Sequence, residues 1–110
     1  MFGIHIMYIY NITFAVEASR LEELLDWIRT YALAGLTRDG ATSPRLTMIE
    51  GSPEEETEIK SVALQLEFAS LAEFGKWESS AFAPVMQKYS VDFAPEPLFF
   101  ATLLRELPIR

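Results

Sequence analysis

Six polar side chains within apolar, strand-like segments are the residues of this sequence best suited to chemistry. They are two amides, two hydroxyls, one carboxylate and one guanidinium: Asn11, Thr13, Arg45, Gln65, Glu67 and Thr102. Amides and hydroxyls both donate and accept hydrogen bonds, and an arginine can hold a carboxylate through two parallel hydrogen bonds. A polar group buried without hydrogen bonds destabilises a fold by about 1–3 kcal/mol. The set therefore predicts either a ligand pocket or a polar network at a subunit interface. Arg45 would pair there with an anionic ligand, or with a carboxylate of its own or a second chain.

Alternating apolar and polar residues predict the strands that position these side chains. Four segments have the composition or the period of two that is typical of strands: Tyr8–Val16, Arg45–Glu50, Ile59–Phe68 and Leu98–Leu107. In the first and third segments, one set of alternate positions is apolar, while the other carries the two amides and Glu67. Thr102 falls on the corresponding mixed face of the last segment, between Phe100 and Leu104.

Two amphipathic segments between these strands predict helices. Each begins with the capping-box pattern of a serine followed three residues later by a glutamate: Ser19 with Glu22, and Ser70 with Glu73. Gly35 is predicted to follow the end of the first helix, because glycine adopts a positive φ at no steric cost. Pro84 lies inside the second helical pattern and is predicted to kink or split it, because proline lacks a backbone donor.

The resulting order, β-α-β-β-α-β, predicts the split βαβ or ferredoxin-like arrangement. We expect one α+β domain over residues 1–110, with residues 1–6 as an N-terminal extension. A four-stranded antiparallel sheet would carry both helices on one face. The other face would expose a costly apolar patch that includes Ile9, Ala15, Ala63, Phe100 and Leu104. A homodimer with facing sheets around a partly polar cleft would cover that patch, and a monomer with a half-solvated sheet is the alternative.

Composition narrows the classes of function. The chain of 110 residues has 16 acidic and 9 basic residues, a net charge of −7, which argues against nucleic acid and against anionic membranes as partners. It has no cysteine and one histidine, so disulfides, thiolate metal sites and cysteine nucleophiles are excluded. We expect no metal and no cofactor. No apolar run approaches the length of a membrane span and no signal peptide is recognisable, so the cytoplasm is the expected location.

Several short motifs together resemble one bacterial family of short proteins. They are YNITF in the first strand, Trp27 in the first helix, SPRL at Ser43–Leu46, LQLEFASL at Leu64–Leu71, and FFATLL near the end. The family is domain-of-unknown-function family 4286, and the resemblance covers roughly Met7–Leu107. It implies a ferredoxin-like fold of the dimeric α/β-barrel kind, and it implies no catalytic residues. Where family members often have a His-Ile-Pro stretch, this chain has Tyr31-Ala32-Leu33, so no role for that histidine carries over.

Three further features favour structural roles. His5 lies in the extension without a positioned partner, although a histidine can act as a base or a haem ligand. The carboxylates of Glu54, Glu55, Glu56 and Glu58 could in principle bind Ca²⁺ or Mg²⁺, but their spacing matches no EF-hand loop and predicts a solvated turn. Asn11 and Trp77 together are similar to residue types that some cofactor-independent monooxygenases of the dimeric-barrel class use, but the spacing of Trp77 predicts a core position.

The sequence therefore predicts a non-catalytic ligand-binding or interaction module, most simply a homodimer with a small-molecule ligand. A small dimeric-barrel enzyme acting on an apolar or aromatic molecule is the alternative. A structural partner of a larger protein is the third possibility.

Overall fold

The protein is described by a computed structural model covering residues 6–51, 58–95 and 97–109. Four strands form one sheet in the order β2-β3-β1-β4, and each neighbouring pair is antiparallel. Their bounds are β1 (Tyr8–Glu17), β2 (Thr42–Met48), β3 (Ile59–Phe68) and β4 (Leu98–Arg105). This is the strand order of the ferredoxin-like α+β fold that the sequence predicts.

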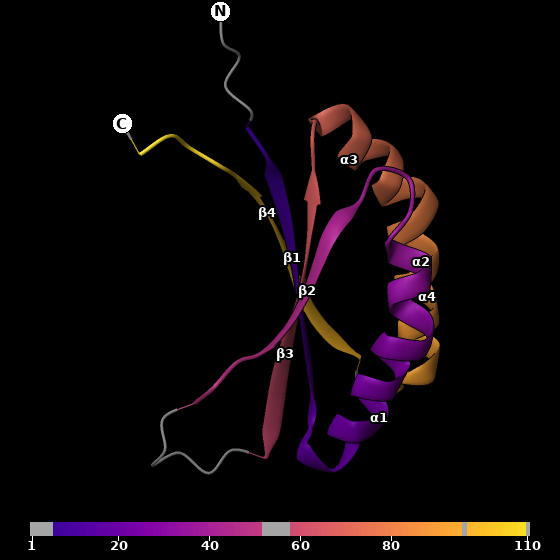
Figure 1. Ribbon diagram of the computed structural model, residues 1–110. Helices are drawn as coiled ribbons and strands as arrows, with labels where there is room; N and C mark the ends of the chain where they lie inside the picture. Colours follow the sequence, from indigo (N-terminus) through magenta and orange to yellow (C-terminus); the bar gives the residue numbers. More distant parts are fainter. Residues whose placement is uncertain (1–5, 52–57, 96, 110) are drawn as a thin grey trace, which may run out of the picture.

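Two helical segments, one after β1 and one after β3, lie on the same side of the sheet (Figure 1). The first consists of η1 (Ala18–Arg20), α1 (Leu21–Trp27), η2 (Ile28–Ala32) and α2 (Leu33–Leu36). The second consists of α3 (Leu71–Trp77), η3 (Glu78–Phe82) and α4 (Ala83–Asp92). Among the described residues, the opposite side of the sheet carries no helix (Figure 1), and we call it the open face.

The helix-covered face holds the hydrophobic core. Alternate residues of β1 and β3 are almost fully buried against the helices: Tyr10, Ile12, Phe14, Val16, Val62, Leu64, Leu66 and Phe68. Trp77 is fully buried among them, and its indole N–H donates a 2.7 Å hydrogen bond to the carbonyl of Leu36. Trp77 is thus a core residue that connects the two helical segments, as its spacing predicts.

Tyr89 connects α4 to the beginning of β4. Its ring is fully buried and lies 5.0 Å from that of Phe14, and its hydroxyl donates a 2.8 Å hydrogen bond to the carbonyl of Leu98. Burial disfavours the charged phenolate and raises the pKa of Tyr89 to about 12.

The two helix starts differ, although their sequence patterns match. Ser70 is extended, and its hydroxyl accepts a 3.1 Å hydrogen bond from the Glu73 backbone N–H, which confirms the predicted cap. Ser19 lies within the tight turn η1, and the residue that precedes α1 is Arg20, whose side chain makes no capping bond. The capping-box prediction for the first helix was therefore wrong. Arg20 instead makes a bidentate ion pair with Glu23, and the chain enters the helix through the turn.

Gly35 and Pro84 both lie inside helices. Gly35 does not follow the first helix as predicted, because α2 continues to Leu36. A Cβ on Gly35 would lie only 2.8 Å from Cγ2 of Val85, so the missing side chain permits close packing of α2 against α4. Pro84 is the second residue of α4, which directly follows the π-helical segment η3, so its missing N–H lies in the first turn of α4. The first helical segment changes helix type in the same way at η2 without a proline, so the irregularity is not specific to Pro84.

Strands β2 and β4 differ most from their predicted bounds. β2 begins at Thr42, earlier than Arg45, and its pairing with β3 shifts register between Thr42 and Arg45. Ser43 in this bulge has a φ of +53°. β4 ends at Arg105, and one further backbone bond joins Glu106 to Met7.

Candidate functional site

Four of the six candidate residues form a continuous row across the open face. Arg45 lies directly opposite Gln65, Gln65 opposite Asn11, and Asn11 opposite Thr102. Residues directly opposite on antiparallel strands point to the same face with Cβ atoms about 4.5–5.5 Å apart. One residue from each of the four strands thus contributes to this row, which we call the polar row.

Thr13 and Glu67 lie on either side of the polar row. Thr13 is two residues from Asn11 along β1, and its hydroxyl accepts a 3.2 Å hydrogen bond from the Asn11 side-chain amide. Glu67 is two residues from Gln65 along β3, opposite Ile9 and Thr42. The structure therefore brings all six predicted residues together on one face.

A cavity of about 290 Å³ opens at the β2 end of the polar row. It is lined by Ile9, Ser43, Pro44, Arg45, Gln65 and Glu67. The bulge in β2 forms one side of it, since the register shift falls between Thr42 and Arg45. Bulges bend a strand and re-aim its side chains, and here the bulge lies directly before the only cationic candidate.

Arg45 and Glu67 are opposite charges that both line this cavity. The ion pairs among the residues that the structure describes are Arg20–Glu23, Arg38–Asp39 and Lys88–Asp92, so neither Arg45 nor Glu67 belongs to one. Gln65 lies between them on the face, opposite Arg45 and two residues before Glu67. The cavity thus offers a cationic guanidinium that donates hydrogen bonds, an amide and a carboxylate. The side chain of Ile9 adds an apolar part.

The other end of the polar row is apolar. Three side chains of β4 share the open face with Thr102, and they are 49%, 68% and 45% exposed: Leu98, Phe100 and Leu104. Ala15 and Ala63 lie on the same face but are nearly buried between larger neighbours. The open face is therefore polar toward β2 and apolar toward β4.

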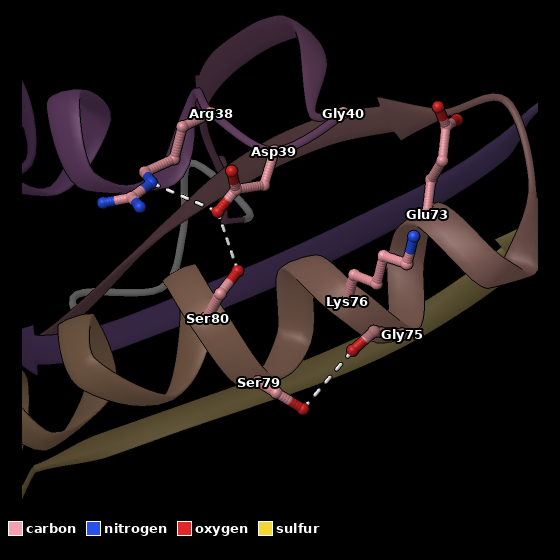
Figure 2. A pocket seen from close by; sticks show the side chains of 8 residues that line it. All are labelled: Arg38, Asp39, Gly40, Glu73, Gly75, Lys76, Ser79 and Ser80. Carbon is pink, nitrogen blue, oxygen red and sulfur yellow. Dashed lines mark hydrogen bonds and ion pairs between the residues drawn. The ribbon is translucent and has the colours of Figure 1, made fainter.

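Sequence reasoning missed a second and larger cavity, on the helix side of the molecule. It has a volume of about 940 Å³ and lies between the loop after α2 and the second helical segment (Figure 2). It is lined by Arg38, Asp39, Gly40, Glu73, Gly75, Lys76, Ser79 and Ser80. The sequence shows this loop only as a polar Asp-Gly turn, because the helix residues that complete the cavity are more than thirty positions away.

Asp39 is held firmly at the rim of this second cavity. Its carboxylate accepts a 2.7 Å hydrogen bond from the Ser80 hydroxyl and a 3.2 Å bond from Arg38 (Figure 2). The bond from Ser80, aided by the charge of Arg38, holds the pKa of Asp39 below its ordinary value. Because Asp39 is already satisfied by side chains of the protein, this cavity has the character of a structural contact between loop and helix.

Several predicted features fall elsewhere. His5 and Glu54–Glu56 lie outside the residues that the structure describes, and Glu58 is exposed just before β3. Among the described residues, no three His, Cys, Asp or Glu side chains are grouped in a way that could hold a metal ion. In the same part of the chain, no helix is both long and apolar enough to cross a membrane.

Fold and site together define a ferredoxin-like α+β protein with one helix-covered sheet face and one open, partly polar face. The sequence matches the family described as "Domain of unknown function (DUF4286)" over residues 7–107. The chain belongs to this family, as the sequence motifs indicate. No curated protein has a sequence that matches this chain significantly.

Solved structures share the fold at low sequence identity. An ethyl tert-butyl ether d (ethd) family protein from Bacillus halodurans superposes with a TM-score of 0.67 at 13% identity, covering 91% of this chain and 99% of that one. A putative antibiotic biosynthesis monooxygenase from Nitrosomonas europaea gives 0.63 at 15%, covering 97% and 95%. A DABB family protein with a ferredoxin-like fold from Mesorhizobium loti gives 0.62 at 18%, covering 94% and 99%. At these identities the likeness shows the fold alone.

Proposed function

We propose that this protein is a cytoplasmic homodimer whose open faces pack together around a cleft that binds a small molecule. Its ligand-binding residues are Asn11, Thr13, Arg45, Gln65, Glu67 and Thr102. The observation that carries the proposal is the polar row, to which each of the four strands contributes one hydrogen-bonding side chain. A row of this kind would be costly beneath a fully apolar interface, but it suits a cleft that holds a polar molecule.

The open face has the size and the apolar content for a dimer interface. Four strands about 4.8 Å apart and seven to ten residues long, at about 3.3 Å per residue, give a projected area on the order of 500 Å². Side chains that stand up from the sheet increase the accessible area toward the roughly 800 Å² per partner of a standard interface. Leu98, Phe100 and Leu104 would supply its hydrophobic part. A second copy of this chain is the occupant that requires no further component.

A dimeric-barrel enzyme is the second candidate, and it is favoured by the fixed orientation of Asn11. The Asn11 amide is bonded to Thr13, whose neighbour across the strand pair is the exposed ring of Phe100. This arrangement offers a directed amide beside an aromatic surface, which suits an apolar or aromatic substrate. One protein of the same fold is described as a putative antibiotic biosynthesis monooxygenase, which supports an enzyme as the alternative. In this alternative Asn11 would orient the substrate, and Glu67 would be the carboxylate available as a base on the open face.

Native mass spectrometry of protein purified without added ligand tests the proposal first. A dimer that carries additional mass is the expected result, and it would identify both the assembly and a candidate ligand. The extra mass should be lost in Asn11→Ala and Gln65→Ala, while Thr30→Ala, an exposed helix position, should retain it. A monomer at micromolar concentration would overturn the facing-sheet arrangement. A clean dimer would shift weight toward an interaction role with a larger protein.

A charged substitution in the apolar part of the open face tests the interface separately. Phe100→Glu should convert the dimer to monomer, because it would bury a carboxylate between the two sheets. Val91→Glu is the matched control, since Val91 is 70% exposed on the outer side of α4. Analytical ultracentrifugation of both variants distinguishes them. If the wild-type protein turns over a retained ligand, and Asn11→Ala remains a dimer but loses this turnover, the enzyme alternative is favoured.

A further inference from the structure

We infer that the cavity beside Arg45 takes a small zwitterion, a molecule with a carboxylate and an ammonium group a few bonds apart, such as a free amino acid. The inference rests on the proposed ligand-binding role of the open face and names the class of ligand. Its basis is that Arg45 and Glu67 line the same cavity of about 290 Å³ and make no ion pair in the described part of the chain.

The strand register places these two charges diagonally on the open face. Arg45 lies opposite Gln65, whereas Glu67 lies two residues farther along β3, opposite Thr42. Such diagonal neighbours are about 7–8 Å apart, within reach of long side chains, yet these two line the same cavity without forming an ion pair. A zwitterion placed between them would give its carboxylate to Arg45 and its ammonium group to Glu67. Both contacts are charge-assisted hydrogen bonds, the stronger kind.

The charges on the open face also favour a ligand of zero net charge. Its charged strand residues are Arg45, Glu67 and Glu17, and Glu17 lies at the far end of β1, opposite Ile59. A ligand with only a carboxylate would satisfy Arg45 but would lie beside the like charge of Glu67, within a chain of net charge −7. A ligand with only an ammonium group would satisfy Glu67 and meet the like charge of Arg45. Of these three kinds of ligand, only the zwitterion offers an opposite charge to both Arg45 and Glu67.

The rest of the cavity suits an apolar side chain on that zwitterion. Ile9 lines the cavity and lies opposite Leu104 of β4, so an apolar surface leads away from the charged pair. Gln65 lies between the two charges and offers both a donor and an acceptor to the polar end of the ligand. An amino acid with an aliphatic or aromatic side chain therefore matches the site best.

Three probes with one carbon skeleton test this inference. L-Phenylalanine carries both charges, 3-phenylpropanoate only the carboxylate, and 2-phenylethylamine only the ammonium group. Isothermal titration of the purified protein should show phenylalanine binding about tenfold or more tightly than either analogue, since one charged hydrogen bond contributes about 1.4 kcal/mol or more. In addition, a thermal-shift screen of the common amino acids would identify an amino acid whose apolar side chain fits the cavity better than that of phenylalanine.

Two variants assign the charges. Arg45→Gln should remove the advantage of phenylalanine over 2-phenylethylamine, and Glu67→Gln its advantage over 3-phenylpropanoate. Arg105→Gln, on the other set of alternate positions of β4, and Glu22→Gln, exposed on α1, are the matched controls and should bind like the wild type. The unfolding midpoint of each variant, measured without ligand, verifies that the fold is retained.

Each remaining outcome overturns the inference. Equal or tighter binding of a singly charged analogue would show that one charge suffices. Unchanged preference in Arg45→Gln and Glu67→Gln would place the ligand elsewhere. No binding by any amino acid would exclude the class. If a ligand is nevertheless retained and depends on Asn11 and Gln65, the proposed function stands and only the zwitterion fails. A monomer that retains no ligand would contradict both the proposed function and the inference of a zwitterion.

Discussion

Both faces of this sheet carry large apolar side chains, but the two faces differ in what covers them and in their polar residues. Phe14 of β1 is fully buried against the helices, while Phe100 of β4, on the open face, is 68% exposed. Among the described residues, the core contains no buried charged side chain, whereas the open face carries the polar row, Arg45 and Glu67. The helices cover one face, and the other leaves hydrogen-bonding groups and apolar side chains partly accessible to solvent, which a second copy would cover in the proposed dimer.

The stability of the monomer comes mainly from the helix-covered face. Apolar area buried by the helices stabilises the monomer, and removal of any large core side chain leaves a void that close-packed neighbours fill poorly. On the edge strands β2 and β4 the open-face side chains are exposed to water, so the monomer gains little from them, whereas those of β1 and β3 are partly or almost fully buried. The exposed side chains are consequently free to be selected for contacts with another molecule.

The largest expected effect compares one phenylalanine from each face. Phe14→Ala should reduce the free energy of unfolding by about 3–5 kcal/mol, because it opens a cavity in the core. Phe100→Ala should change it by less than about 1 kcal/mol at concentrations where the protein is monomeric. Urea unfolding monitored by circular dichroism measures both. Similar costs for the two substitutions would contradict the division of the sheet into a closed and an open face.

Alkaline pH should loosen the closed face through Tyr89. An unfolded tyrosine loses its proton near pH 10, whereas burial raises the pKa of Tyr89 in the folded protein to about 12. The stabilisation by the neutral phenol is thus complete below pH 10 and is lost as the pH rises from 10 to 12, by about 2–3 kcal/mol. Urea unfolding across this range should show the loss in the wild type and in Tyr31→Phe, a half-exposed control. Tyr89→Phe should show a smaller loss, since burial also raises the pKa of Tyr10, and a loss equal to that of the wild type would assign the effect to other groups.

Alanine substitutions at two helical glycines should change stability in opposite directions, because one glycine is closely packed and the other is not. Gly35→Ala should destabilise the protein by about 1–3 kcal/mol, because the new Cβ would lie 2.8 Å from Val85. Gly75→Ala should stabilise it by about 0.5–1 kcal/mol, because its Cβ would meet nothing within 4 Å and alanine favours the helix. Thermal unfolding should therefore shift in opposite directions. Two shifts of the same sign would mean that α2 and α4 are not packed as closely as described.

The smallest expected effect concerns the two serines before the helices. Ser70→Ala should cost about 1 kcal/mol, because it removes the hydrogen bond that caps α3. Ser19→Ala should change little, since Ser19 lies in a turn and makes no capping bond. Chemical unfolding at one pH resolves this difference. A comparable loss in Ser19→Ala would restore the capping box that the sequence predicts for the first helix.

Much of the fold was predictable because its signals are local. The alternation in residues 8–16 and 59–68 predicted which side chains face the helices, and the third strand has the predicted bounds. The first capping box failed because the same four-residue pattern can enter a helix through a tight turn, and Arg20 had an ion-pair partner there. Gly35 was misplaced because its requirement is set by Val85, fifty positions away.

The order of the elements and the family were readable from the sequence. So was the face on which Asn11, Thr13, Gln65, Glu67 and Thr102 lie, because a period of two is a property of each strand alone. The face of Arg45 was not, because a register shift precedes it in β2. Only the tertiary structure decided that Arg45, Gln65, Asn11 and Thr102 form a single row. It also decided that a bulge opens a cavity between Arg45 and Glu67, and that loop and helix enclose a second cavity. Register and cavity shape depend on the pairing of segments far apart in the chain, and that pairing is fixed only when the core behind the sheet is packed.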